Sequence, residues 1–208
     1  METPIDATAE VVLQVNPGDW ADLPVGTAAL GHGEGGTVAL TYVGLTKLRL
    51  GCDGGAEGDW ARFDAPAPLP EGPVLIEDTM AGQYEPQTVL PGTTALGRSW
   101  SLGALGSFAV TTPEPNVARA TITPTPGGVV TQDFRKAIME GYDGTAAFNL
   151  ADPSEIFVPT PLVALRAADG TGRVIASWAS FEGVHYDVYA LGAESIREGE
   201  TYVYWCAF

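Results

Sequence analysis

Short runs of β-forming residues, each ended by glycine, proline or aspartate, recur along the whole chain. The 208 residues include 26 glycines and 16 prolines, and both residue types favour turns over helices. The runs between them are rich in valine, threonine and aromatic residues, which fit the pleated surface of a sheet. The pattern predicts an all-β protein, an antiparallel β-sandwich or jelly-roll-like fold with long Pro/Gly-rich loops.

The clearest strand signals lie in the C-terminal third. Residues 162–167 and 173–180 flank the turn sequence Asp-Gly-Thr-Gly, which predicts a hairpin, and 184–191 form the next predicted strand. The last run, TYVYWCAF at 201–208, is apolar or aromatic on both faces, so we expect the domain or a partner to cover both sides. Further strands are predicted at 11–15, 37–43, 45–50, 60–63, 74–77, 108–112 and 117–123.

One short helix is predicted near 132–140. Phe134, Ala137 and Ile138 would share one side of it, and Gly141 would end it. A helix of two turns is a connector rather than a scaffold element, so it does not change the all-β expectation.

The length of the chain suits one large β domain, because all-β sandwiches commonly reach 200 residues undivided. We expect a single domain over 1–208 with a flexible N-terminal arm at 1–8. A sub-boundary would fall within 113–128, where four prolines interrupt the chain. The proline-rich segment 64–91 is expected to be an extended surface loop apart from 74–77, and such loops commonly bind or assemble.

The charge balance is strongly acidic, with 26 acidic and 10 basic side chains and a formal net charge of −16. Proteins bind phosphate backbones and anionic lipids through lysine and arginine. We therefore expect neither direct nucleic-acid binding nor membrane binding. The N-terminus has no basic or apolar signal region, so we expect a chain made in the cytoplasm without a signal peptide, in which Cys52 and Cys206 are ordinary thiols.

Sequence patterns typical of catalytic sites are missing. The string GRSWS at 97–101 lacks the closing glycine of a nucleophile elbow, and the glycine-rich segment 31–36 lacks the lysine of a phosphate loop. His185 and Asp187 share one face of a predicted strand, like half of a non-haem iron site, but no second histidine follows them. We interpret them as a polar strand face exposed to water, and we expect no enzymatic activity.

One acidic loop is a candidate calcium site. Asp53, Glu57 and Asp59 place three carboxylates in a glycine-rich loop between two predicted strands. Oxygen ligands on a flexible loop suit calcium. The spacing fits no EF-hand, however, and acidic glycine-rich turns also serve solubility. We expect no other cofactor.

Aromatic residues supply the candidate binding and interface positions. Trp20 and Trp100 lie in polar sequence, so we expect them to be loop residues that pack back onto the domain. The alternative is that they anchor an interface or stack on a sugar. The full set of candidates is Trp20, Trp100, Tyr202, Tyr204, Trp205 and Phe208.

These features favour a protein that works by assembly. We expect a structural component of a virion, such as a phage capsid decoration or tail protein, whose partners are copies of itself and other particle proteins. The alternative is a carbohydrate- or ligand-binding β module, with calcium as an optional ligand and Trp20, Trp60 and Trp100 as stacking platforms.

Overall fold

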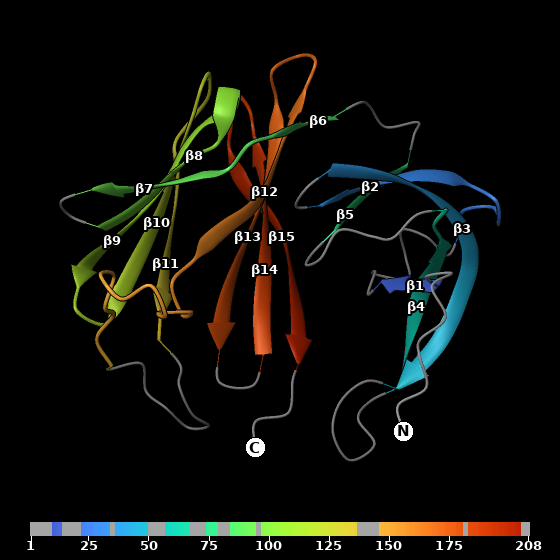
Figure 1. Cartoon of the computed structure of the whole chain (residues 1–208), viewed down its shortest axis with the longest axis horizontal. Coiled ribbons are helices and arrows are strands. Elements are labelled where there is room, and N and C mark those ends of the chain that lie inside the picture. The colour runs from blue at the N-terminus through green and yellow to red at the C-terminus, as the bar shows by residue number, and fades with distance from the viewer. Residues whose placement is uncertain are drawn as a thin grey trace. The chain divides into compact units, whose positions relative to one another are not determined.

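The computed structural model describes residues 10–13, 22–33, 36–49, 57–66, 74–78, 84–94, 97–136, 146–180 and 183–204 (Figure 1). In these residues it shows fifteen strands, β1 to β15, and one short 3-10 helix, η1 (Gly103–Leu105). The all-β prediction is confirmed. The predicted arm at 1–8 lies outside the described residues.

The chain divides into two compact units, Met1–Gln83 and Tyr84–Phe208. The segment 113–128, where a sub-boundary was expected, lies inside the second unit and contains the turn between two paired strands. That the two units fold together as one domain stays a prediction.

The first unit holds sheet I, an antiparallel sheet with the order β1-β4-β3-β2-β5. Its core contains Tyr42 and Phe63, whose ring centroids are 5.5 Å apart. Two predicted strands, 37–43 and 45–50, form parts of the single long strand β3, because a bulge between Tyr42 and Gly44 lets the strand continue. The strands of this sheet are β1 (Glu10–Leu13), β2 (Ala28–Gly33), β3 (Gly36–Arg49), β4 (Glu57–Asp64) and β5 (Leu75–Asp78).

The second unit is a sandwich of two antiparallel five-stranded sheets. Sheet II has the order β11-β10-β9-β8-β7 and sheet III the order β15-β14-β13-β12-β6, so β11 and β15 lie at one side and β6 and β7 at the other. Only Thr88 and Val89 separate β6 from β7, where the chain passes from one sheet to the other. The strands of sheet II are β7 (Leu90–Thr94), β8 (Gly97–Ser101), β9 (Gly106–Glu114), β10 (Val117–Pro124) and β11 (Val130–Arg135). Those of sheet III are β6 (Tyr84–Gln87), β12 (Thr160–Ala167), β13 (Gly172–Ser180), β14 (Gly183–Leu191) and β15 (Ile196–Tyr204).

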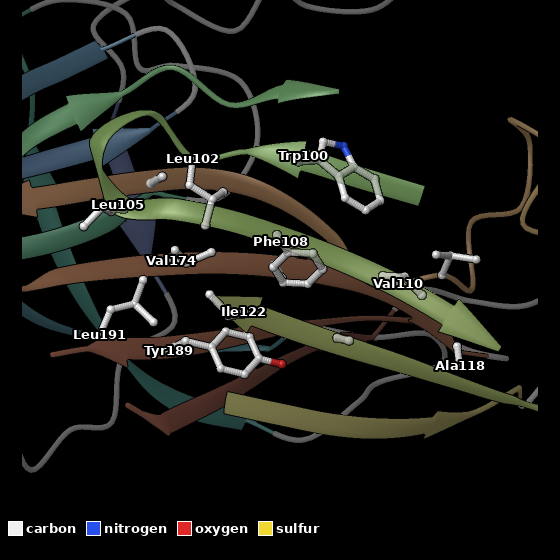
Figure 2. Packing of buried hydrophobic residues seen from close by; sticks show 14 of the residues in the cluster. Trp100, Leu102, Leu105, Phe108, Val110, Ala118, Ile122, Val174, Tyr189 and Leu191 are labelled. Carbon is white, nitrogen blue, oxygen red and sulfur yellow. The ribbon is translucent and has the colours of Figure 1, made fainter. Parts of the chain in front are cut away.

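The core of the sandwich lies between sheets II and III. Figure 2 shows Trp100, Phe108 and Ile122 from sheet II packed with Val174 and Tyr189 from sheet III. The alternating residues of both sheets that face this layer are buried, which is the arrangement expected of a β-sandwich.

Two sequence expectations about local structure are wrong in the described residues. The predicted helix near 132–140 is instead strand β11 up to Arg135, and 137–140 lie outside the described part of the chain. In β11, Gln132 and Phe134 turn inward while Thr131 and Asp133 are exposed, so the alternation of a strand outweighs a weak helical pattern. The segment 64–91 is not only loop, since β6 lies within it and β7 begins there.

Candidate functional site

The second unit has four edge strands, and they differ in how they are protected. β6 contains Pro86 and β7 contains Pro91, which lack the N–H that a further strand would use. β11 ends at the exposed Arg135, and its Asp133 is paired with Arg119 of β10; charged side chains oppose edge pairing. β15 pairs on one side with β14, and the described residues place no strand along its other side. The last four residues of β15, Thr201 to Tyr204, contain neither proline nor a charged residue.

A buried carboxylate lies beneath β15. Asp187 of β14 is 0% exposed. Its Oδ1 accepts hydrogen bonds from Arg197 Nε at 2.8 Å and Arg197 Nη2 at 2.6 Å, and its Oδ2 accepts one from Trp178 Nε1 at 3.0 Å. A fully buried charge is stable only when paired and hydrogen-bonded, and this one is both.

The network continues to the surface through Glu200. Its carboxylate is paired with Arg197 and with His185 Nδ1. The His185 ring stacks on the Trp178 ring at a centroid distance of 3.9 Å and an angle of 6°. Strand β15 is thus joined to β14 and β13 by side chains as well as by the ladder.

Aromatic and polar contacts link this network to sheet II. Phe134 of β11 meets the Trp178 ring edge-on, with centroids 5.3 Å apart. Tyr189 Oη donates a hydrogen bond to Gln132 Oε1 at 2.8 Å. The network therefore closes the side of the sandwich between β11 and β15.

The electrostatics favour the ionised network. Burial acts to raise the pKa of Glu200, but hydrogen bonds from Arg197 and His185 outweigh it and hold that pKa below its usual range. Burial acts to lower the pKa of Arg197, and its two carboxylate partners raise it overall. Burial, together with the Asp187 charge, raises the pKa of the Tyr189 phenol. Tyr189 therefore stays a neutral donor.

The remaining charged side chain of β15 is also paired within the sandwich. Glu198 Oε2 lies 2.6 Å from Arg173 Nε of β13. All three charged residues of β15, Arg197, Glu198 and Glu200, thus have partners in their own sheet. The arrangement fixes the strand in place and leaves its outer edge without unpaired charge.

A second buried ion pair has a structural role. Lys136 Nζ lies 2.5 Å from Glu155 Oε2, and the Asn149 N–H donates to the same oxygen at 3.2 Å. Arg98 of β8 donates to the carbonyl oxygens of Leu150 at 3.0 Å and Glu155 at 3.3 Å. These contacts anchor the connection between β11 and β12.

The prediction for His185 and Asp187 is half confirmed. They do share a face of β14, but the expectation that this face is exposed to water is wrong for Asp187, which is fully buried. Sequence reasoning missed the partners Arg197 and Glu200. The other histidine, His32, is buried, with Nδ1 2.9 Å from Thr37 Oγ1 across a hairpin.

The structure describes two of the three residues of the predicted calcium site. Asp53 lies outside the described residues, whereas Glu57 and Asp59 lie in β4 rather than in a loop. Their cross-strand partners in β3 are the basic residues Arg49 and Lys47. In the described ranges no three potential ligands form a group that could hold a metal ion. Calcium binding stays a prediction.

The predicted aromatic positions are only partly described. Trp100 lies in strand β8 rather than in a loop, and it does pack back onto the domain: it is 9% exposed and meets Phe108 edge-on at 5.7 Å. Tyr202 and Tyr204 lie in β15. Trp20, Trp205 and Phe208 lie outside the described residues. The same is true of both cysteines, Cys52 and Cys206.

Three comparisons with known proteins found no match. Neither family models nor curated proteins nor solved structures yielded a match to this chain. Among the residues that the structure describes, no helix has the length and apolarity needed to cross a membrane.

Proposed function

We propose that this protein works by assembly through protein–protein contacts, as a structural component of a virion such as a phage capsid decoration or tail protein. The observation that carries the proposal is the outer edge of β15. An edge strand presents unpaired N–H and C=O groups that another chain can pair with. Here its charged side chains are paired inward, and the sequence from Thr201 to Phe208 contains no charged residue.

Exposed apolar side chains support the same proposal. Ile196, at the start of β15, is 56% exposed, and Val129, just before β11, is 58% exposed. Both side chains lie next to β11 or β15, the edge strands on one side of the sandwich. Assembly would remove such side chains from water.

The carbohydrate-binding alternative has weaker support. Trp60 and Trp100 are each 9% exposed, and a stacking platform needs an open indole face. No described contact favours a sugar, so the alternative is an outcome of the tests rather than a second proposal.

The native mass tests the proposal. Light scattering over a wide range of protein concentration is expected to give masses above the 21.7 kDa monomer, and negative-stain microscopy to show discrete particles. Because each chain carries a net charge of −16, added salt is expected to increase assembly by screening repulsion. A 21.7 kDa species at every concentration and salt level would contradict the proposal.

A further inference from the structure

We infer that the side chains of Lys136 and Glu155 form an intramolecular amide bond. Lys136 directly follows β11, and Glu155 lies in the connection from β11 to β12. Lys136 Nζ lies 2.5 Å from Glu155 Oε2, and only 14% of the lysine side chain and 5% of the glutamate side chain are exposed. A primary amine and a carboxyl group in contact are the two reactants of amide formation. The inference concerns a covalent modification within the second unit and is independent of the proposed function.

Lysine at this position departs from the general use of arginine in the chain. Only two of the ten basic residues are lysines, Lys47 and Lys136. Elsewhere in the described part of the second unit, arginine pairs with carboxylates, at Arg119, Arg173 and Arg197. Arginine suits a buried ion pair because its planar group binds a carboxylate through two N–H groups. Lysine has one property that arginine lacks: its amine becomes a nucleophile when it loses a proton.

The surroundings of the pair favour uncharged groups. The ring centroids of Phe148 and Phe157 lie 5.7 and 5.3 Å from Lys136 Nζ, so aromatic carbon covers the pair. Charges are costly in such surroundings. One proton transfer from the ammonium to the carboxylate converts the ion pair into a neutral amine and a neutral carboxylic acid. These two neutral forms are the ones that react.

Backbone groups hold the reactants in contact. The Asn149 N–H donates to Glu155 Oε2 at 3.2 Å, and the Ala147 carbonyl oxygen accepts a hydrogen bond from Lys136 Nζ at 3.4 Å. Arg98 donates to the backbone carbonyl oxygen of Glu155 at 3.3 Å. Because Oε2 is 2.5 Å from Nζ, the carboxyl carbon bonded to it lies within about 3.7 Å of the amine. This distance is close to the separation of about 3–3.5 Å from which groups held in a protein react.

The bond forms by attack of the neutral Lys136 Nζ on Cδ of Glu155. The Asn149 N–H stabilises negative charge on Oε2, so the acid proton lies on Oε1. In the tetrahedral intermediate, the bond from Cδ to Oε1 breaks, and Oε1 leaves as water with its own proton and one proton from Nζ. The product is a secondary amide, and the step needs no oxidant, reductant or further reactant.

Mass spectrometry of the intact, purified chain tests the inference. The linked protein should be lighter by one water than its sequence requires. Lys136→Arg should have the full mass, because it keeps the charge but removes the amine. Lys47→Arg is the matched control, since Lys47 is exposed on β3, and it should keep the loss of water. The full mass for the unsubstituted protein, even after prolonged incubation, would overturn the inference.

Peptide mapping of the unsubstituted protein identifies the linked residues, and it serves equally if Lys136→Arg fails to fold. Trypsin cleaves after Arg135 and Arg166, and a linked Lys136 should leave the single peptide 136–166. A second cleavage after Glu140 should give two fragments that stay joined through the amide. Fragments that separate would overturn the inference, since the water would then have been lost elsewhere. A loss of ammonia instead of water would also overturn it, because the acyl group would then come from an asparagine or glutamine.

Discussion

The buried carboxylate of Asp187 is expected to be a large single contributor to the stability of the sandwich. Its removal in Asp187→Ala leaves Trp178 Nε1 without its acceptor, which costs about 1–3 kcal/mol. The charge-assisted bonds from Arg197 are also lost, at about 1.5–3 kcal/mol, but Arg197 is 35% exposed and can turn to water, so the lower end applies. The expected loss is about 3 kcal/mol, or a decrease in Tm of about 6–12 °C.

Urea and thermal unfolding followed by tryptophan fluorescence measure this loss. Asp187→Asn keeps an acceptor for Trp178 and removes only the charge, so it should lose roughly half as much stability. Asp133→Asn is the control: its pair with Arg119 is exposed, and its Tm should match that of the unsubstituted protein. An unchanged Tm for Asp187→Ala, or equal losses for the alanine and asparagine variants, would refute the reasoning.

Three further predictions concern an ion pair, the two cores and two glycines. Because the folded-state pKa of Glu200 is lowered, its contribution is present above the unfolded value near pH ~4.3 and is lost as pH falls through the folded value. The stability gap between the unsubstituted protein and Glu200→Gln should therefore narrow on acidification from pH ~5, and a gap that widens would contradict the ion pairing. Phe108→Ala in the sandwich core should cost about 3–5 kcal/mol. If the two units form one domain, calorimetry should show a single unfolding transition that both Phe108→Ala and Phe63→Ala, in the first unit, shift to lower temperature. Two transitions, each shifted by only one of these variants, would contradict a single domain. In thermal melts, Gly106→Ala should lower the Tm far more than Gly26→Ala. Both glycines have a positive φ, but a Cβ added at Gly106 would lie 2.1 Å from Thr123 O, whereas a Cβ added at Gly26 would meet no atom within 4 Å. Equal effects would mean that φ alone sets the cost.

The strands that sequence predicts best are those whose pattern comes from the core. β10 alternates between buried and more exposed residues over most of its length, because one of its faces packs between the sheets. β12 and β13 are apolar runs with three consecutive buried residues each, at 163–165 and 174–176, and a turn sequence joins them. β7 and β8, with the sequences LPGTT and GRSWS, have little apolar alternation. Their pairing with neighbouring strands makes them strands, and a local pattern does not contain that information.

The candidate site was only half predictable for a geometric reason. A simple period of two places His185 and Asp187 on one face, and the structure agrees. The same period would place Arg197 and Glu200, three residues apart, on opposite faces. The bulge in β15 turns both toward Asp187 and His185. Gly199, an isolated glycine beside the bulge, is the sequence signal that could have indicated it.

The two-residue passage between β6 and β7 limits how sheets II and III can move relative to each other. The three steps from Gln87 to Leu90 reach at most about 11 Å, and packed sheets lie about 10 Å apart. The passage is therefore little longer than the spacing of packed sheets, and it limits how far the two sheets can separate along that side. Any separation of the sheets would be larger along the opposite side, where β11 and β15 lie, and there the contacts of Phe134 with Trp178 and of Tyr189 with Gln132 oppose it.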